Sequence, residues 1–256
     1  MGLDMKLESI FQYLNGLLLV EGYPDYPHAL NGMQVDGPGE VGHVAVAVDA
    51  SEATISEAVN RGADLLIVHH GLFWKGLQPV TGRHFRKIRK LIEGQVALYS
   101  CHLPLDSHPE VGNCILMARA LGLEIGGPFG KHQGANIGWW GRKPGGVASA
   151  VLAGELELIL KGPVRLIEGG PEVIERIGVV TGAGGSFIEE SVGLGLDALI
   201  TGEVSHAEYF DAVELGISVL LGGHYATETF GVKALGAHLE ERFGLTWEFL
   251  EHPTGF

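Results

Sequence analysis

The sequence is short of basic residues and of long apolar runs. Its 256 residues contain 17 Lys and Arg against 31 Asp and Glu, which gives a formal net charge of −14. A protein that neutralises a nucleic-acid backbone needs a basic face, so we expect no nucleic acid among the partners. An anionic small molecule remains compatible with this charge, because bound cations reverse the potential of a site. No apolar run reaches the ~18–20 residues that cross a membrane, so we expect no membrane partner.

Cysteine is also scarce. Cys101 and Cys114 are the two cysteines of the sequence, and they make no disulfide framework. This usage is typical of a reduced, cytoplasmic protein, and we expect that location. The first residues, MGLDMKLESI, carry no basic segment ahead of an apolar run, so we expect no signal peptide there. With a hydrophobic content of 46%, the chain has the composition of a globular protein.

Apolar segments alternate in type along the chain. Runs typical of strands are separated by amphipathic stretches of about 10–15 residues, a pattern that predicts an α/β fold with a largely parallel sheet. We expect helices over about 7–20, 51–62, 83–95, 109–122 and 148–161, and strands over 43–50, 63–70, 96–101 and 164–169.

The chain also contains an internal repeat. Residues 44–70 align with 177–203 at an offset of 133, with nine of 27 positions identical, among them Gly62/Gly195 and Asp64/Asp197. At an offset of 122, residues 93–106 align with 215–228, and the change of 11 assigns an insertion to the loop FWKGLQPVTGR. We therefore predict two similar α/β halves, residues 1–126 and 127–256, with an approximate boundary and with C-terminal elements able to pack back on the first half.

Histidines and acids collect where the strands of both halves end. Ligands of α/β sheets gather beyond the carboxyl ends of the strands, so these side chains can converge on one site between the halves. Imidazoles and carboxylates suit Zn, Fe, Mn, Co or Ni, and more than four such ligands suit two neighbouring metals. The candidates are His69, His70, His102 and Asp106 in the first half, and Glu203, His206, His224 and Glu228 in the second.

The adjacent pair His69-His70 needs a special geometry. Neighbouring residues of a regular strand face opposite ways, so one histidine could be core and the other surface. Both can serve one site if the strand ends there and the chain turns, which Gly71 permits. The matched offsets place His102 on His224 and so favour a metal site. His102 is either a ligand or a proton carrier that supports the ligands.

Two further signals have alternatives. Glu203 aligns with His70, and His206 follows three residues later; they either orient ligands and move protons or are a capping acid and a surface histidine. The stretch TGAGGSFIEE follows a strand, and it either cradles an anion or simply starts a helix.

Four segments together carry a family resemblance: LLIVHHGLFWKG, CHLPLDSHPEVGN, LITGEVSHAE and GGHYATETFGVKAL. In this order and spacing they resemble the NIF-three-like family, whose members are often labelled GTP cyclohydrolase type 2. The resemblance covers the chain from about residue 5 to its C-terminus. It implies two related α/β halves, a homohexamer built as a trimer of dimers, and two divalent metal ions per chain. The metal ligands it implies are His69, His70, Asp106, His224 and Glu228, with Glu228 bridging.

The resemblance also implies an activity. The expected function is a dinuclear metal-dependent hydrolase that converts GTP to dihydroneopterin triphosphate and formate, with His102, Glu203 or His206 moving protons. The small-molecule substrate would then be a nucleotide. Two alternatives stay open, since a shared site does not fix a substrate. One is a phosphoesterase or amidohydrolase acting on another metabolite, and the other is a metal-binding scaffold or adaptor without turnover.

Overall fold

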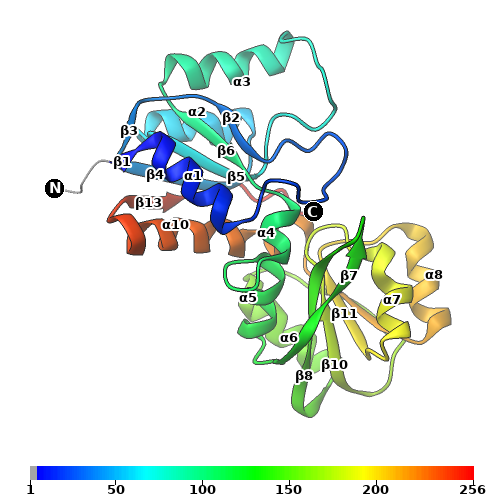
Figure 1. The fold of residues 1–256 in the computed structure, drawn as a ribbon. Helices are drawn as coiled ribbons and strands as arrows, with labels where there is room; N and C mark the ends of the chain where they lie inside the picture. The colour runs from blue at the N-terminus through cyan, green and yellow to red at the C-terminus, as the bar shows by residue number, and fades with distance from the viewer. Residues whose placement is uncertain (1–4) are drawn as a thin grey trace. The chain divides into compact units, whose positions relative to one another are not determined.

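A computed structural model describes residues 5–256 of the chain. Residues 1–4, part of the stretch on which the expectation of no signal peptide rests, lie outside the described residues. The chain divides into two compact units, Met1–Leu105 with Gly231–His252, and Asp106–Phe230 with Pro253–Phe256. Each unit has a sheet of its own (Figure 1). The boundary expected after residue 126 falls inside a strand of the second unit, β7 (Glu124–His132).

The first unit is built on a five-stranded sheet in the order β13-β4-β5-β6-β2. β13, β4, β5 and β6 are parallel, and β2 is antiparallel to β6. Its strands are β2 (Gly32–Val35), β4 (His43–Asp49), β5 (Leu65–His70), β6 (Ala97–Ser100) and β13 (Thr246–Phe249), beside a two-stranded ribbon of β1 (Met5–Lys6) and β3 (Glu40–Val41).

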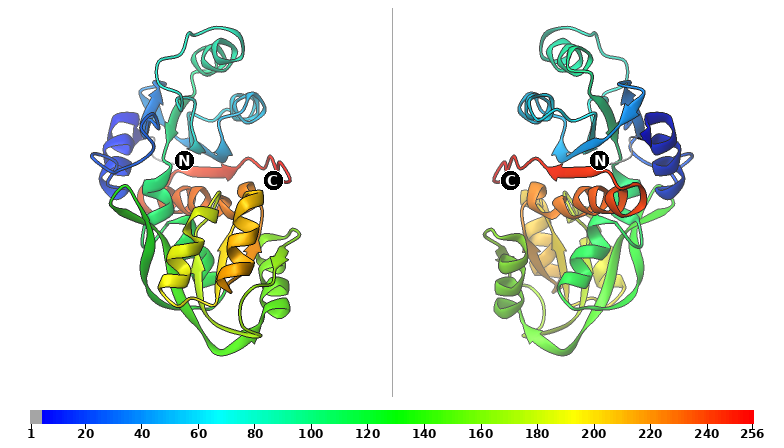
Figure 2. Two further views of the ribbon diagram at one scale, coloured as in Figure 1. Left: turned by 90° about the vertical axis from the view of Figure 1, so that its right-hand side faces the viewer. Right: turned by 90° about the vertical axis from the view of Figure 1, so that its left-hand side faces the viewer.

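Helices cover both faces of this sheet. Its helices are α1 (Leu7–Leu17), α2 (Glu52–Asn60), α3 (Gly82–Glu93) and α10 (Thr229–Phe243), and α4 (Leu103–Ser107) leads into the second unit. α2 and α3 lie on one face, and α1 and α10 on the other, where Tyr13 bonds His238 at 2.6 Å (Figure 2). Two covered faces explain why β4 reads as the nearly unbroken apolar run HVAVAVD, with Val44–Val48 buried.

The second unit has a six-stranded sheet in the order β7-β8-β10-β11-β12-β9. β10, β11 and β12 are parallel, whereas β8 and β9 run antiparallel to their neighbours. The remaining strands are β8 (Ala135–Ala148), β9 (Arg165–Ile167), β10 (Val173–Val179), β11 (Ala198–Thr201) and β12 (Ser218–Leu221). Its helices are α5 (Asn113–Ala120), α6 (Ser149–Leu160), the 3-10 turn η1 (Gly185–Phe187), α7 (Ile188–Gly193), α8 (His206–Leu215) and α9 (His224–Thr227).

The α/β class and the internal repeat are confirmed, and two aspartates show the repeat most clearly. The Asp64 carboxylate accepts hydrogen bonds from the backbone N–H groups of residues 42 and 43 at 2.8 and 2.9 Å. The Asp197 carboxylate accepts them from residues 175 and 176 at 2.8 and 2.7 Å. Both the aspartates and their donors are 133 positions apart. The shared Asp thus fixes the start of one strand beside the preceding strand in each unit.

The second part of the repeat has a different register from the one expected. Leu65 pairs with Ala97 in the first sheet, and its counterpart Ala198 pairs with Ser218 in the second, so the strands are related by 121 positions rather than 122. Gly223 therefore occupies the backbone position of His102, and its N–H bonds the Gly202 carbonyl at 3.0 Å. The alignment of His102 with His224 was wrong by one residue, because an extra glycine precedes His224.

The long hairpin of β7 and β8 was not expected from the sequence. Its strands read EIGGPFGKH and ANIGWWGRKPGGVA, and glycine and proline weaken the usual strand signal. The Trp140 indole lies where a Cβ of Gly126 would be, at 2.5 Å, so the glycine makes room for a large aromatic neighbour. Among residues 5–256, no helix is long and apolar enough to cross a membrane.

Candidate metal centre

Three histidines of the first unit lie together at one edge of its sheet. His69 and His70 are the last two residues of β5, and His102 follows β6, the next strand of the sheet. Each offers a ring nitrogen within 4.8 Å of those of the other two. His69 is fully buried and His102 is 9% exposed, so the cluster is largely withdrawn from water. We call these three residues the histidine cluster.

Each ring of the histidine cluster is held through the same nitrogen. The Nδ1 atoms of His69, His70 and His102 lie 3.0, 3.0 and 2.9 Å from an oxygen that can only accept. A carbonyl or carboxylate partner requires a proton on Nδ1, which leaves the lone pair of the neutral ring on Nε2. Histidines that bind metals are held in this way, with the second nitrogen donated to an oxygen.

The partners come from different parts of the first unit. The Cys101 carbonyl accepts a hydrogen bond from the His69 ring. The Asp49 carboxylate, at the end of β4, accepts one from His70, and the Asp25 carboxylate accepts one from His102. His69 and His70 are thus turned by the strands on either side of β5, and their ring centroids lie 4.7 Å apart. This explains how two adjacent strand residues serve one cluster.

Glycine is needed at position 71 for a different reason from the one expected. It does not adopt a left-handed conformation, so the backbone turn does not require a glycine. A Cβ at Gly71 would collide with the Gln34 carboxamide. The Gln34 Oε1 atom accepts a hydrogen bond from the Leu72 N–H at 2.7 Å. Glycine therefore admits a side chain that fixes the chain just after the two histidines.

The second unit carries a separate group built around α9. His224 begins this short helix, and Glu228 follows its last residue. His224 Nε2 lies 3.2 Å from Glu228 Oε1, and His224 Nδ1 lies 2.8 Å from Glu203 Oε1. Glu228 is buried with 2% exposure, whereas the Glu203 side chain is 47% exposed. The hydrogen bond and charge of Glu228, together with Glu203 and against the effect of burial, raise the pKa of His224 to about 9.

The glycine-rich turn of the second unit packs against these acids. Gly182 has φ +66°, and the Glu228 Oε1 atom lies where its Cβ would be. Gly185 meets the Glu208 carboxylate in the same way. The glycines of TGAGGSFIEE thus let acidic side chains approach the backbone, which argues against the anion cradle. α7 begins after this turn without a side-chain cap.

Asp106 belongs to the second unit and is 4% exposed. Its Oδ1 atom accepts hydrogen bonds from Asn113 Nδ2 and Thr181 Oγ1, both at 2.9 Å. These two donors fix the orientation of a buried carboxylate. His206 is different, because it is exposed at the first turn of α8 and stacks edge-on against Phe210.

Sequence reasoning missed the residues that hold the ligand candidates. Asp25 and Asp49 orient His102 and His70, yet Asp25 lies in a loop about 75 residues earlier in the chain, and Asp49 ends a neighbouring strand. Asn113 and Thr181 play the same part for Asp106. A carboxylate at the end of a strand next to His70 was a usable signal for Asp49, whereas nothing local marks Asp25.

These donors fit a divalent metal ion. Neutral imidazoles that present Nε2, and buried carboxylates, are the ligand types of Zn, Fe, Mn, Co and Ni sites. A buried carboxylate such as Glu228 is costly unless a cation accompanies it. In the metal-free chain the His224 proton supplies that positive charge. Each unit therefore carries residues that could bind a metal.

The chain is similar to known proteins along nearly its whole length. The chain is 45% identical over 256 residues to a Halobacterium salinarum protein, covering 98% of this chain and 100% of that protein. A Deinococcus radiodurans protein is 42% identical over 253 residues, covering 98% and 95%. Both are named GTP cyclohydrolase 1 type 2 homolog.

A solved structure from Thermus thermophilus is similar at a TM-score of 0.90 and 40% identity, covering 98% of this chain and 100% of that one. Residues 5–254 match the model of one protein family. The family resemblance of the sequence is thereby confirmed, and the chain belongs to the Duf34/NIF3 (NGG1p interacting factor 3) family.

Proposed function

We propose that this chain is a hydrolase that binds two divalent metal ions through His69, His70, Asp106, His224 and Glu228. The observation that carries the proposal is the shared arrangement of the histidines, each with Nδ1 on an oxygen and Nε2 presented as a ligand atom. The matching family and the names of its homologues support GTP as the first substrate to test.

The chain's own residues would prepare this centre. Asp49 holds the ring of His70, and Glu203 holds the ring of His224, so that little reorganisation is needed on metal binding. Buried Glu228 would bridge the ions, since one carboxylate can bind two metals. When bound, two neighbouring metals act as Lewis acids and lower the pKa of water.

With GTP as substrate, one water would add at C8 of the purine and open the imidazole ring to a formamide, and a second water would hydrolyse the formamide to formate and a free amine on the way to dihydroneopterin triphosphate. These steps require proton transfers, for which we propose His102, Glu203 and His206. Glu203 is exposed enough to exchange protons with water while it bonds His224. His206 is exposed as well, next to Phe210.

Metal analysis and a GTP assay test this proposal together. The chain, freed of metal and reconstituted with Zn, Mn, Fe, Co or Ni, should bind about two ions and form a fluorescent pterin from GTP. Glu228→Ala should lose metal, whereas His132→Ala, at the end of β7, should keep both metal and activity. A content clearly below two ions contradicts the dinuclear centre. A fully loaded chain that forms no pterin contradicts the GTP assignment, and a panel of phosphodiesters and amides then tests the hydrolase class.

His102 has two candidate roles that the same analysis separates. Its ligand atom lies within 4.8 Å of those of His69 and His70, which makes it a candidate third histidine ligand in the first unit. The alternative is the proton carrier proposed above. His102→Ala should lose metal if His102 is a ligand, and should lose turnover at full metal content if it carries protons.

The assembly and location follow from the resemblance. We propose a cytoplasmic homohexamer, arranged as a trimer of dimers. Sedimentation equilibrium of the metal-loaded chain should give six times the chain mass of 27.3 kDa. A monomer or dimer at micromolar concentration would contradict the hexamer without bearing on the metal ligands.

A further inference from the structure

Helix α3 is strongly basic in a protein of net charge −14. Its sequence GRHFRKIRKLIE holds five of the 17 Lys and Arg residues of the whole chain, and one acidic residue. Clustered positive charge in an acidic protein calls for an explanation, either as ion pairs with neighbouring acids or as a site for an anion.

Part of this charge is neutralised within the first unit. Arg86 forms two hydrogen bonds with the Glu52 carboxylate, at 3.0 and 2.6 Å. Arg89 pairs with Glu93 at 2.8 Å. These arginines are therefore ordinary members of surface ion pairs.

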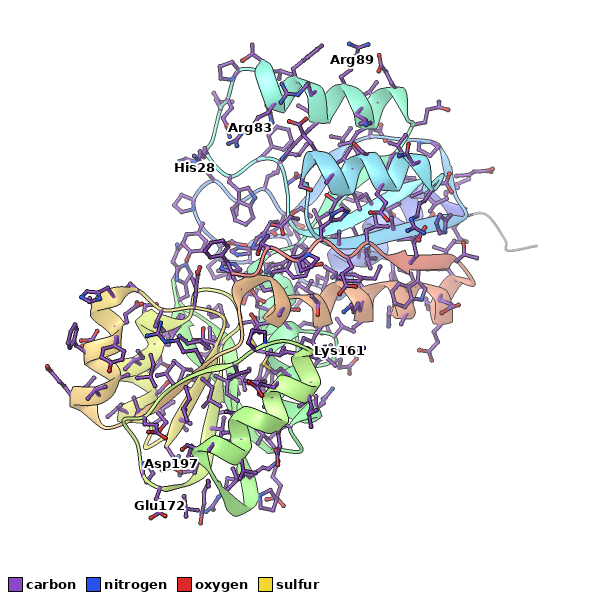
Figure 3. The ribbon with its side chains drawn as sticks, turned by 180° about the vertical axis from the view of Figure 1, so that it is seen from behind. His28, Arg83, Arg89, Lys161, Glu172 and Asp197 are labelled. Carbon is purple, nitrogen blue, oxygen red and sulfur yellow. The ribbon has the colours of Figure 1, made fainter. Side chains whose placement is uncertain are left out.

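The other three basic residues of α3 form no ion pair with a carboxylate in the part of the chain that the structure describes. Lys90 donates at 2.6 Å to the Ser56 hydroxyl. Arg83 and Lys87 are the pair of interest. Over residues 5–256, Arg83 makes no ion pair or hydrogen bond, and the Lys87 ammonium donates at 2.7 Å to a neutral group, the Ala50 carbonyl. Their spacing of four places them on one face of α3, with Arg83 near its beginning and Arg89 towards its end (Figure 3). Lys87 is half-buried, and burial together with the charge of Arg83 lowers its pKa, against smaller opposing effects of Glu52 and Asp49. The nearest acid that acts on both cations is Glu52, and its carboxylate is already bound by Arg86.

Lys87 is linked through Ala50 to the histidine cluster of the same unit. The Ala50 carbonyl accepts the hydrogen bond from Lys87. The residue before it, Asp49, accepts a hydrogen bond from His70 Nδ1 at 3.0 Å. The Ala50 N–H in turn bonds the His70 carbonyl at 2.9 Å. Lys87 therefore contacts Ala50, and Ala50 is hydrogen-bonded to the backbone of His70, a candidate metal ligand. An anion bound by Lys87 would therefore lie on the side of α3 that is linked through Ala50 to His70.

We propose that Arg83 and Lys87 form a phosphate-binding subsite, which holds the phosphate groups of a small substrate while its reacting part meets the metal ions. The proposal rests on the proposed function for the reaction, and it narrows the substrate to a phosphorylated compound such as a nucleoside triphosphate. The two side chains suit this division of labour, because a guanidinium grips phosphate oxygens in pairs and an ammonium supplies a point charge. In an acidic protein the subsite also gives a polyanion a local attractive field.

Inorganic tripolyphosphate is the probe for this subsite. Its binding to the full chain is measured calorimetrically after removal of metals, so that metal ions cannot bind the probe. Arg83→Gln and Lys87→Met should each weaken binding about tenfold or more, the effect of losing one charge-assisted hydrogen bond. Arg89→Gln is the matched control, because it removes the same charge from the same helix, and it should change the affinity less than about twofold.

Kinetics with GTP then separate this subsite from the reaction. If GTP is turned over, Arg83→Gln should raise KM about tenfold at unchanged metal content. Equal weakening by Arg83→Gln and Arg89→Gln, or tripolyphosphate binding that survives the double change of Arg83 and Lys87, overturns the subsite. Tripolyphosphate binding that depends on Arg83 in the metal-free chain, together with no GTP turnover by the metal-loaded chain, supports the subsite and contradicts the proposed GTP reaction. Circular dichroism and the melting temperature of each variant verify that it is folded.

Discussion

Replacing Asp25 by Asn should destabilise the first unit and disturb the histidine cluster. The Asp25 side chain is 4% exposed and receives four hydrogen bonds. Tyr26 N and His102 Nδ1 donate to Oδ1 at 2.6 and 2.9 Å, and Asn31 Nδ2 and Leu103 N donate to Oδ2 at 2.8 and 3.1 Å. Burial raises the pKa of Asp25, but His102, Asn31 and Tyr26 together outweigh it, so that its pKa lies below the ordinary value.

The size of the effect follows from these bonds. Asparagine has one acceptor oxygen, and its amide would face two donors, so two of the four hydrogen bonds are lost. Leaving a buried donor unsatisfied costs about 1–3 kcal/mol, which gives a loss of about 2–6 kcal/mol for the two. For a protein of this size, 1 kcal/mol corresponds to about 2–4 °C in melting temperature, so the midpoint should fall by about 4–24 °C.

Thermal unfolding of the metal-free chain, followed by circular dichroism, measures this loss. Asp36→Asn is the matched control, because Asp36 is exposed and receives one hydrogen bond, from the Gly37 N–H at 2.9 Å. Its midpoint should change by less than about 2 °C. If His102 is a ligand, metal content after reconstitution should also fall in Asp25→Asn, since the ring of His102 loses its anchor; if it carries protons, turnover should fall instead.

A melting temperature of Asp25→Asn within 2 °C of the parent would refute the reasoning. It would mean that the buried carboxylate is not satisfied by these four donors, and that His102 is held by something else.

The pH dependence of stability offers a second check on Asp25. A carboxyl with a lowered pKa adds stability that is present above its ordinary pKa and lost as the pH falls through the lowered value. The acid side of the stability profile should therefore be flatter in Asp25→Asn.

Two further predictions concern the second unit. In the metal-free chain, Glu228→Gln should bring the pKa of His224 from about 9 back towards 6.5, and NMR titration of the imidazole measures it. The raised pKa adds stability below about pH 6.5 that is lost as the pH rises through about 9, so the variant should lose this dependence; an unchanged titration would contradict the pairing. Gly182→Ala should destabilise the chain by about 1–3 kcal/mol and weaken metal binding, because φ is +66° and Glu228 occupies the Cβ position. Gly193→Ala, at the open end of α7, should instead stabilise by about 0.5–1 kcal/mol, and equal effects of the two changes would refute the account of Gly182.

Much of the fold could be predicted because local sequence patterns indicate the strands and turns. Strands buried on both faces read as apolar runs, as in HVAVAVD and LLIVHH. The repeated Gly and Asp recur because each unit needs the same turn and the same anchor for a strand, which the hydrogen bonds of Asp64 and Asp197 confirm. The hairpin of β7 and β8 could not be predicted, since its pairing depends on contacts such as Trp140 over Gly126.

The sequence by itself determined the α/β class, the internal repeat and the family, because periodicity, spacing and motifs are properties of the chain order. It also singled out the pair His69-His70 as a candidate for metal binding. Only the tertiary structure decided why both rings serve one cluster: β4 and the residue after β6 hold them from either side through Asp49 and the Cys101 carbonyl. It also replaced the alignment of His102 with His224 by one with Gly223, and revealed Asp25 beneath His102. Hydrogen bonds between residues tens of positions apart leave no local pattern, and they are what orients a site.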